Sequence, residues 1–380
     1  MKTALFPQSE MQDPYAFYDE ILANSPVWWD DVNKIWAVYP YDYCNSILNH
    51  PLTAIPPVST AGFDPAALVI ASNLVRLSNA PQHASLRDVT MGLFHHLQPV
   101  ETSSLIHDLI WQQPDPSHFD WTKICKKLPL LHLLEGFRFD RATSNHIAAL
   151  IPELVYIMLP QKTPDQLVLI NKVSTELYNI IETHLYRNTT FFSIIQSFTQ
   201  SGMNQEDVIN CCVSNITGLL IQSYDALRGL LSLVLLYYLE HKEQWKPDLL
   251  FLQRAVTELL RFDPPIHNTR RIATGDFSID DITIKQGERI LLILAAANRD
   301  PRQFVHAHLF DTDRTNNDQA LTFGTGVHAC IARHFSVELV ATSMYYLLTR
   351  YKSIQLADDY PAFEPLVNAR IPCSFKIKVL

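Results

Sequence analysis

Apolar residues recur every three or four positions along much of this chain, the pattern of helices that pack one face against a core. The longest such run begins at Asn204-Gln-Glu-Asp207, which offers a capping Asn and an acidic first turn, and it reaches Leu239. Further helices are predicted at residues 13–21, 41–48, 102–203 (with polar breaks near 113–118 and 161–164) and 331–351. The pattern therefore predicts a mainly helical protein.

A smaller set of segments is rich in β-branched and aromatic residues, which indicates strands. Residues 27–29 and 35–39 flank the polar Asp30-Asp-Val-Asn33, so we expect a hairpin there. Further strands are predicted at 277–284 and 289–293, and residues 371–380 alternate as a final hairpin.

Residues 51–78 are rich in Pro, Ala and Ser and only weakly periodic, so they are predicted to form a long loop. The apolar residues of this segment can pack in the core. The family resemblance described below implies instead that they contact an apolar substrate, and the sequence does not decide between the two. They are Ile55, Val58, Phe63, Leu68, Val69 and Ile70.

Composition narrows the class of protein. A chain that is 47% hydrophobic and 18% charged can bury a large core, and a net charge of −9 argues against a nucleic-acid partner. The best membrane-spanning candidate, residues 229–239, is about half the length that a bilayer requires. The six cysteines lack disulfide-like spacing, which is typical of a reducing compartment. We expect a cytoplasmic protein with no membrane segment.

The most informative chemistry lies in Phe323-Gly-Thr-Gly-Val-His-Ala-Cys330, directly before the last predicted helix. Two glycines permit a tight turn, and Cys330 is expected in the first helical turn, where the helix dipole favours a thiolate. The spacing of His328 and Cys330 is poor for zinc. A single thiolate on such a turn fits an axial ligand of haem iron, and a buried structural cysteine is the alternative.

Two residue pairs at helical spacing add to this chemistry. His83 and Arg87 share a helix face after Pro81 and suit a fixed anion, although a solvated surface pair is the alternative. Glu258 and Arg261 lie one turn apart, and they form either an ordinary surface pair or a buried one.

In their order and distances along the chain, these motifs resemble those of the cytochromes P450, the haem-thiolate monooxygenases. The matching motifs are Phe323-Gly324-x-Gly326-x-His328-x-Cys330, Glu258-Leu-Leu-Arg261, His83-Ala-Ser-Leu-Arg87 and Ala296-Ala-Asn-Arg-Asp-Pro301. The resemblance covers nearly everything from Asp13-Pro-Tyr15 to the C-terminus.

The resemblance implies the family's mainly α fold, a helical prism around haem with a small β-rich lobe. It implies one domain over residues 1–380, with β-rich parts at about 27–55, 271–295 and 371–380. The implied cofactor is haem b (iron protoporphyrin IX), with Cys330 as its iron ligand. The other implied cofactor-binding residues are His83, Arg87, Arg271, Phe323, Gly324 and His328. Glu258 and Arg261 would form a buried pair that positions the ligand loop.

The same resemblance implies monooxygenation of a small, largely apolar organic molecule by a monomer. Electrons would come from a ferredoxin and ferredoxin reductase, because the chain carries no fused reductase domain. We expect this donor to dock near Arg333 and His334, with Lys126-Lys127 as further contacts.

The central helix departs from the family pattern, which is Ala/Gly-Gly-x-Asp/Glu-Thr where the helix crosses the iron. This chain has Gln222-Ser-Tyr-Asp-Ala226, so the acid survives as Asp225 and the threonine has become Ala226. We expect Gln222, Ser223 and Asp225 to handle protons at the catalytic site beside Ala226. Alternatively, Gln222 merely fills space and Asp225 pairs with Arg228. A smaller departure is Ala332 in place of a common glycine.

Three functions remain open from the sequence. The first is a monooxygenase with rearranged proton delivery. The second is a haem-thiolate enzyme that uses peroxide or catalyses a dehydration or rearrangement. The third is a haem-binding protein without turnover.

Overall fold

The N-terminal part of the chain builds a small helix and a hairpin, as the sequence predicts. The computed structural model describes residues 3–380. Helix α1 (Pro14–Asn24) is capped by Asp13, whose side chain accepts a hydrogen bond of 2.9 Å from Tyr15 N. Strands β1 (Val27–Asp30) and β2 (Ile35–Val38) then form the predicted antiparallel hairpin.

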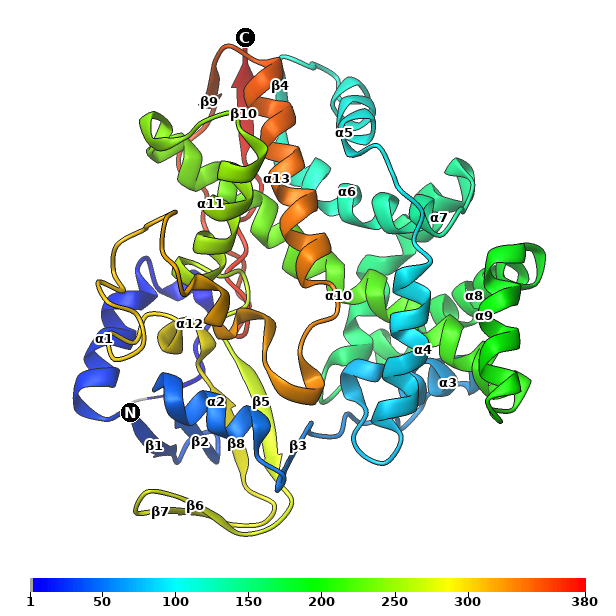
Figure 1. Ribbon diagram of the computed structural model, residues 1–380, viewed down its shortest axis with the longest axis horizontal. Coiled ribbons are helices and arrows are strands. Elements are labelled where there is room, and N and C mark those ends of the chain that lie inside the picture. The colour runs from blue at the N-terminus through cyan, green and yellow to red at the C-terminus, as the bar shows by residue number, and fades with distance from the viewer. Residues whose placement is uncertain (1–2) are drawn as a thin grey trace. The chain divides into compact units, whose positions relative to one another are not determined.

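This hairpin is one edge of a five-stranded sheet in the order β1-β2-β8-β5-β3 (Figure 1). The added strands are β3 (Thr53–Ala54), β5 (Thr269–Ala273) and β8 (Arg289–Leu292). Alternate residues of β8 point to opposite faces, so Ile290 and Leu292 enter one buried cluster and Leu291 enters another. Helix α2 (Tyr41–Asn49) packs in the first cluster, and α1 packs in the second; α12 (Leu294–Ala297) contributes to both.

Two smaller sheets complete the β structure. Residues 277–284 form a hairpin of β6 (Phe277–Ile279) and β7 (Ile282–Ile284). The other sheet pairs β10 (Lys376–Val379) with β4 (His118–Asp120) and β9 (Ile354–Leu356). The predicted hairpin over residues 371–380 is therefore wrong. The alternating pattern belongs to one strand between two partners, while Pro372 pairs with Phe363 in an isolated bridge.

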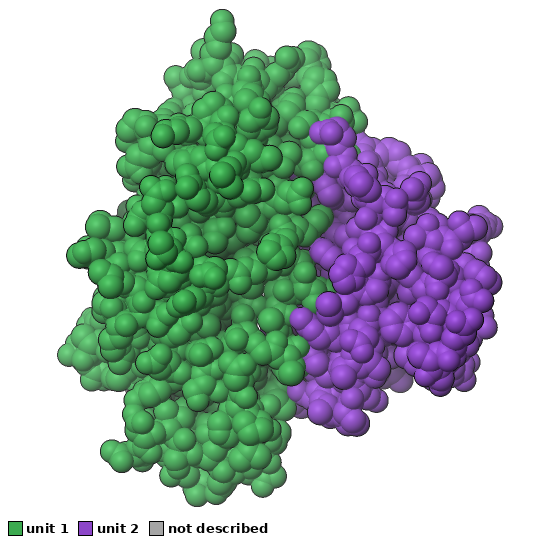
Figure 2. All heavy atoms as spheres, viewed as in Figure 1, with its two compact units in different colours: residues 1–56, 102–126, 225–380 green, residues 57–101, 127–224 purple. Residues whose placement is uncertain are grey.

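Contacts divide the chain into two compact units, coloured green and purple in Figure 2. Unit 1 comprises Met1–Pro56, Thr102–Lys126 and Asp225–Leu380, and unit 2 comprises Pro57–Glu101 and Lys127–Tyr224. Two of the four boundaries fall within α6 (Trp121–Gly136) and α10 (Gln205–Glu240), and the other two follow Pro56 and Glu101. The remaining helices of unit 1 are α5 (Thr102–Trp111), α11 (Leu249–Phe262) and α13 (Arg333–Arg350). Those of unit 2 are α3 (Pro65–Asn73), α4 (His83–His95), α7 (Arg141–Leu154), α8 (Pro164–Arg187) and α9 (Thr189–Gln200).

Helix α3 overturns the prediction of a loop over residues 51–78. Pro65 occupies the first turn of α3, where a proline costs little, and Ala67, Ile70 and Ala71 form its buried face. The periodicity was masked because Leu68, on the other face, is also apolar and is 45% exposed. Ile55 and Ile70 are buried, so they serve as core residues.

Helix α10 starts as predicted, because the side chain of Asn204 accepts a hydrogen bond of 2.9 Å from Glu206 N. This helix is the one described segment long and apolar enough to cross a membrane, yet 78% of its most apolar window is buried inside the protein. Such burial is typical of a core helix.

The Glu258–Arg261 pair on α11 is buried, with both side chains 0% exposed. Arg261 Nη2 lies 2.7 Å from Glu258 Oε1 and also donates to Leu309 O, while Nη1 donates to Asn298 O and Ala307 O. Glu258 Oε1 accepts from Asp311 N at 3.1 Å. The pair therefore holds the segment that leads from α12 to the Cys330 loop, and the alternative of a surface pair is wrong.

We predict that Glu258→Ala lowers the free energy of unfolding by about 3–5 kcal/mol, because it leaves Arg261 charged and buried without its partner. Arg254→Ala is the matched control on α11, since Arg254 and its partner Asp313 are 49% and 78% exposed. The control should cost under about 1 kcal/mol in urea unfolding followed by circular dichroism. Equal losses in the two variants would contradict this assignment.

Candidate functional site

The Cys330 loop is a series of tight turns between η6 (Leu321–Phe323) and α13. Its two glycines both have positive φ, 64° at Gly324 and 67° at Gly326, as the sequence predicts for a sharp turn. A Cβ on Gly326 would meet Asn49 Oδ1, so this position also lacks space for a side chain. The loop closes where Cys330 N donates to Phe323 O at 2.8 Å.

Cys330 lies before the helix rather than in its first turn, which corrects the sequence-based expectation. Helix α13 begins at Arg333, and Ala332 occupies the N-cap position without a side-chain hydrogen bond. The dipole effect falls off within the first turn, so the dipole argument does not apply to Cys330. The apolar periodicity placed the start two residues too early because Ile331 and Ala332 belong to the turn before the helix.

Cys330 differs from the other cysteines in its exposure. Cys44, Cys125, Cys211 and Cys212 are buried, Cys373 is partly buried and Cys330 is exposed. Burial raises the pKa of Cys211 to about 12 and raises the pKa values of the other three buried thiols further. Those thiols are inert packing residues, whereas Cys330 is accessible to a ligand or metal.

A buried asparagine anchors the start of this loop. Asn298, at the end of α12, donates to Thr322 Oγ1 at 2.7 Å and accepts from Leu321 N at 2.6 Å. Thr322 Oγ1 in turn bonds to Leu260 O of α11. Sequence reasoning noted the Ala296–Pro301 stretch but assigned no role to Asn298. Its signal was an asparagine inside an apolar stretch, where a polar side chain needs partners.

The predicted cofactor-binding cations are found in both units. In unit 1, Arg271 lies on β5 and is 4% exposed, and His328 ends η7 (Gly326–His328). In unit 2, His83 is buried at the start of α4, and its Nδ1 lies 2.9 Å from Ser78 Oγ. Arg87 lies one turn further along α4, so the predicted shared helix face is present.

The central-helix residues have well-defined partners. Gln222 Nε2 donates to Gly218 O at 3.0 Å, and Ser223 Oγ donates to Leu220 O at 2.9 Å. Asp225 pairs with Arg228 at 2.8 Å, as the alternative interpretation of the sequence held. Helix α10 continues unbroken through this stretch.

Arg228 has a second partner that the sequence did not indicate. Its Nη1 and Nη2 donate to the two carboxylate oxygens of Glu364 at 2.7 and 2.9 Å. Burial alone would lower the pKa of Arg228, but the bonds to Glu364 and the charge of Asp225 raise it. Glu364 lies 136 positions away in a stretch without periodicity, so no sequence signal joined the two.

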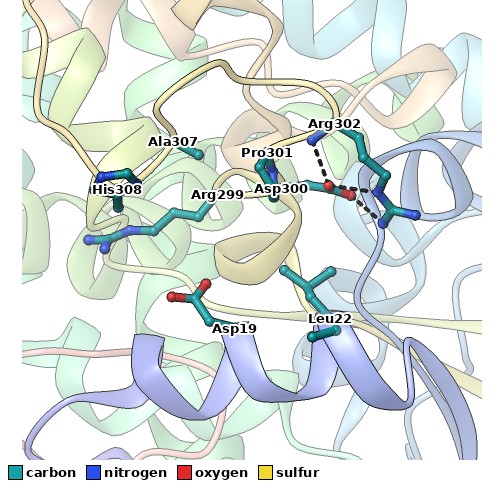
Figure 3. Close-up of a pocket in the computed structure, with 9 residues that line it drawn as sticks. Asp19, Leu22, Arg299, Asp300, Pro301, Arg302, Ala307 and His308 are labelled. Atoms are coloured by element: carbon teal, nitrogen blue, oxygen red, sulfur yellow. Dashed lines mark hydrogen bonds and ion pairs between the residues drawn. The ribbon is translucent and has the colours of Figure 1, made fainter.

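A separate cleft of about 380 Å³ lies in unit 1 between α1 and the segment after α12 (Figure 3). Figure 3 shows Arg299 and His308 on one side and Asp19 of α1 facing them, with Arg302 bonded to Asp300. Burial raises the pKa of Asp19. None of the predicted site residues lines this cleft, so it is distinct from the Cys330 loop.

Comparisons with known proteins agree with the motifs. The sequence model of the cytochrome P450 family matches residues 240–370. The biotin biosynthesis cytochrome P450 of Bacillus subtilis (strain 168) is 26% identical over 396 residues, an alignment that covers 96% of this chain and 97% of that protein.

Two solved structures illustrate the shared fold. The crystal structure of P450BioI in complex with acyl carrier protein ligated to hexadec-9Z-enoic acid has a TM-score of 0.83 at 23% identity, covering 98% of this chain and 100% of that chain. CYP109E1 from Bacillus megaterium in complex with corticosterone has a TM-score of 0.81 at 17% identity, covering 96% of this chain and 98% of that chain.

The predicted fold class, mainly helical with a small β-rich region, is thus confirmed. The motif around Cys330, the buried Glu258–Arg261 pair and the nearly full-length bacterial relatives lead to one assignment. The findings support the cytochrome P450 family, with bacterial homologues over nearly the full length of the chain.

Proposed function

We propose that this P450 inserts an oxygen atom into a small, largely apolar organic molecule, using electrons from a separate ferredoxin-type partner. The observation that carries the proposal is an exposed thiol, Cys330, on a two-glycine turn anchored by Asn298. We further propose that residues 1–380 act as one P450 domain, in the cytoplasm and as a monomer. The near-complete coverage of both chains in the P450BioI comparison supports the single domain.

The residues of the Cys330 loop fit the family's cofactor. A Cβ on Gly324 would meet nothing closer than His328 O at 3.8 Å, so this side of the loop is open to a flat group. We propose Cys330 as the iron ligand of haem b.

Other residues would hold the haem at its edge. In unit 1, Arg271 and His328 are of the types that supply the cations and donors that carboxylate groups require. Phe323 and Gly324 would lie against the porphyrin. When bound, a thiolate-ligated haem supplies electron density that favours O–O bond cleavage.

The proton-handling groups are those of α10 near Ala226. Ala226 has no hydroxyl to donate, and the donor atoms of Gln222 and Ser223 are engaged with carbonyls of their own helix. Asp225, whose side chain is 38% exposed, is then the group best able to take and release a proton. We therefore assign proton delivery to Asp225.

An apolar substrate is supported by the ligands of two structural neighbours. Hexadec-9Z-enoic acid and corticosterone are both largely hydrocarbon, although their shapes differ greatly. Because the two ligands differ so much in shape, they support an apolar class of substrate but do not identify the molecule. A screen of apolar compounds by difference spectroscopy would identify ligands that displace water from the iron.

A second function is favoured by one observation, the replacement of the usual threonine by Ala226. A haem-thiolate enzyme that uses peroxide, or that catalyses a dehydration or rearrangement, does not need that hydroxyl to deliver protons to oxygen. The two functions differ in the oxidant that drives product formation.

We predict that Cys330→Ala abolishes the thiolate-type absorption band of the reduced protein with carbon monoxide, because the variant has no axial sulfur. Cys373→Ala is the control, since Cys373 is the next most accessible thiol and lies outside the motif. If this absorption band persists in the Cys330→Ala variant, another residue binds the iron.

We predict that Asp225→Asn lowers NAD(P)H-driven product formation by about 10²-fold, because a general acid contributes roughly that much. Peroxide-driven turnover should change little, since peroxide brings its own protons. Ala226→Thr is the companion variant and should raise NAD(P)H-driven turnover if the second function is correct. Equal losses in both assays of Asp225→Asn would contradict proton delivery by this residue.

We predict that the rate of reduction by an acidic ferredoxin falls as ionic strength rises, because salt screens charge steering. Arg333→Glu should lower the rate several-fold at low salt. Lys285→Glu on the exposed Asp276–Lys285 pair is the control with the same change in net charge. An equal effect of the two reversals would exclude a docking site at Arg333 and His334.

A further inference from the structure

One guanidinium in unit 1 serves two carboxylates. Arg228 Nη2 donates to Asp225 Oδ1 at 2.8 Å and to Glu364 Oε2 at 2.9 Å, so the two acids share a single nitrogen. The side chain of Arg228 is only 9% exposed, and these partners compensate its buried charge. The three groups together carry one negative charge in excess.

The two carboxylates are not equivalent. Glu364 uses both oxygens in a fork with Nη1 and Nη2, whereas Asp225 uses Oδ1 alone, with Nε and Nη2 as donors. Among residues 3–380, no hydrogen bond reaches Asp225 Oδ2. Glu364 is also the less exposed of the two, 25% against 38%. Asp225 therefore has the oxygen at which a proton can be added.

Glu364 is fixed by its backbone. Glu364 N donates to Ile371 O at 2.9 Å, and Cys373 N donates to Ala362 O at 2.8 Å, so the segments 362–364 and 371–373 pair. This pair lies tightly against α10, because a Cβ on Gly229 would come within 2.8 Å of Pro265 and 3.3 Å of Ile371. The backbone at Glu364 is thus held in place independently of Asp225.

This arrangement removes the main obstacle to protonation of Asp225. A buried arginine that loses its only anion is left uncompensated, which is costly. Here the fork to Glu364 remains when Asp225 takes a proton at Oδ2. In addition, a second carboxylate near the same cation disfavours the ionised form of its neighbour.

We propose that Glu364 is a positioning residue that, through Arg228, allows Asp225 to exchange a proton. The inference rests on the proposed function, because proton exchange by Asp225 matters to the enzyme only if Asp225 delivers protons. The coupling between the two carboxylates does not depend on turnover. The two carboxylates interact through one cation, Arg228.

Other titratable groups lie within electrostatic range of this cluster. Cys373 interacts with Glu364, Arg228 and Lys126, and Cys125 interacts with Arg228. Burial raises the pKa of both thiols, so they remain neutral when the carboxylates titrate. Lys126 is exposed.

The test is the titration of Asp225 in the intact haem protein. The ferrous carbon monoxide form is diamagnetic, so carboxyl carbons labelled in aspartate can be followed by ¹³C NMR, with Asp225→Asn identifying the signal. Glu364→Gln removes the competing negative charge and the carboxylate fork from Arg228. The ionised form of Asp225 is then favoured, and its midpoint should fall by about one pH unit or more.

Two controls separate this effect from others. Glu364→Asp keeps the charge and should keep the midpoint closer to the wild-type value than Glu364→Gln does. Asp276→Asn removes a carboxylate from the exposed pair with Lys285 and should leave the midpoint unchanged. A midpoint that stays constant or rises in Glu364→Gln overturns the inference.

A second variant serves if Glu364→Gln does not fold. Arg228→Lys keeps the charge but cannot form the fork to Glu364 and still bond Asp225, so the midpoint of Asp225 should rise by about one pH unit. An unchanged or lower midpoint would again overturn the inference. The proposed function fails independently, through the carbon monoxide spectrum of Cys330→Ala.

Discussion

The buried Glu258–Arg261 pair is the interaction on which the Cys330 loop depends. Two charges with no exposed surface are stable only if nearly every donor and acceptor is used. Arg261 meets this condition by binding three backbone carbonyls between Asn298 and Leu309, and it lies 5.4 Å from the ring of Phe304. The side chain of Asn298 is hydrogen-bonded to Leu321 and Thr322, so the start of the Cys330 loop is held as well. The turn that presents Cys330 is thus fixed by helix α11, although it lies far from α11 in sequence.

The protein uses buried arginines in two different ways. Arg261 binds main-chain oxygens as well as one carboxylate, and main-chain oxygens cannot change their charge, so that site is static. Arg228 binds the carboxylates of Asp225 and Glu364, and a carboxylate can gain a proton. The arrangement around Arg261 fixes the conformation of a loop, whereas the arrangement around Arg228 contains groups that can take up a proton. In both, the guanidinium fork is what connects segments distant in sequence.

Local features of the sequence were sufficient for much of the fold but not for the long-range parts. The cap at Asn204 and the hairpin of β1 and β2 depend on neighbouring residues, and both were predicted correctly. Helix α3 was missed because apolar residues on both of its faces hide the periodicity. The partner of β10 was missed because strand pairing over long separations leaves no local pattern.

The candidate site also combines features set by neighbouring residues with features set by long-range contacts. The motif containing Cys330 and the spacing of Glu258 and Arg261 were recognisable, since each is written within a few residues. The position of Cys330 outside the helix was not, because the turn at Ile331 is apolar like the helix itself. Glu364 and Asn298 acquire their importance only from contacts made in the folded chain.

The unbroken course of α10 has a consequence for how this enzyme could change. A helix that opens at a glycine offers main-chain carbonyls to water, and such a feature is difficult to adjust by single substitutions. Here the carbonyls of Gly218 and Leu220 are covered by Gln222 and Ser223, so the polar surface is made of side chains. Side chains can be exchanged one at a time without altering the backbone. The chemistry that we propose for this stretch of α10 can therefore be tuned one residue at a time, by selection or by design.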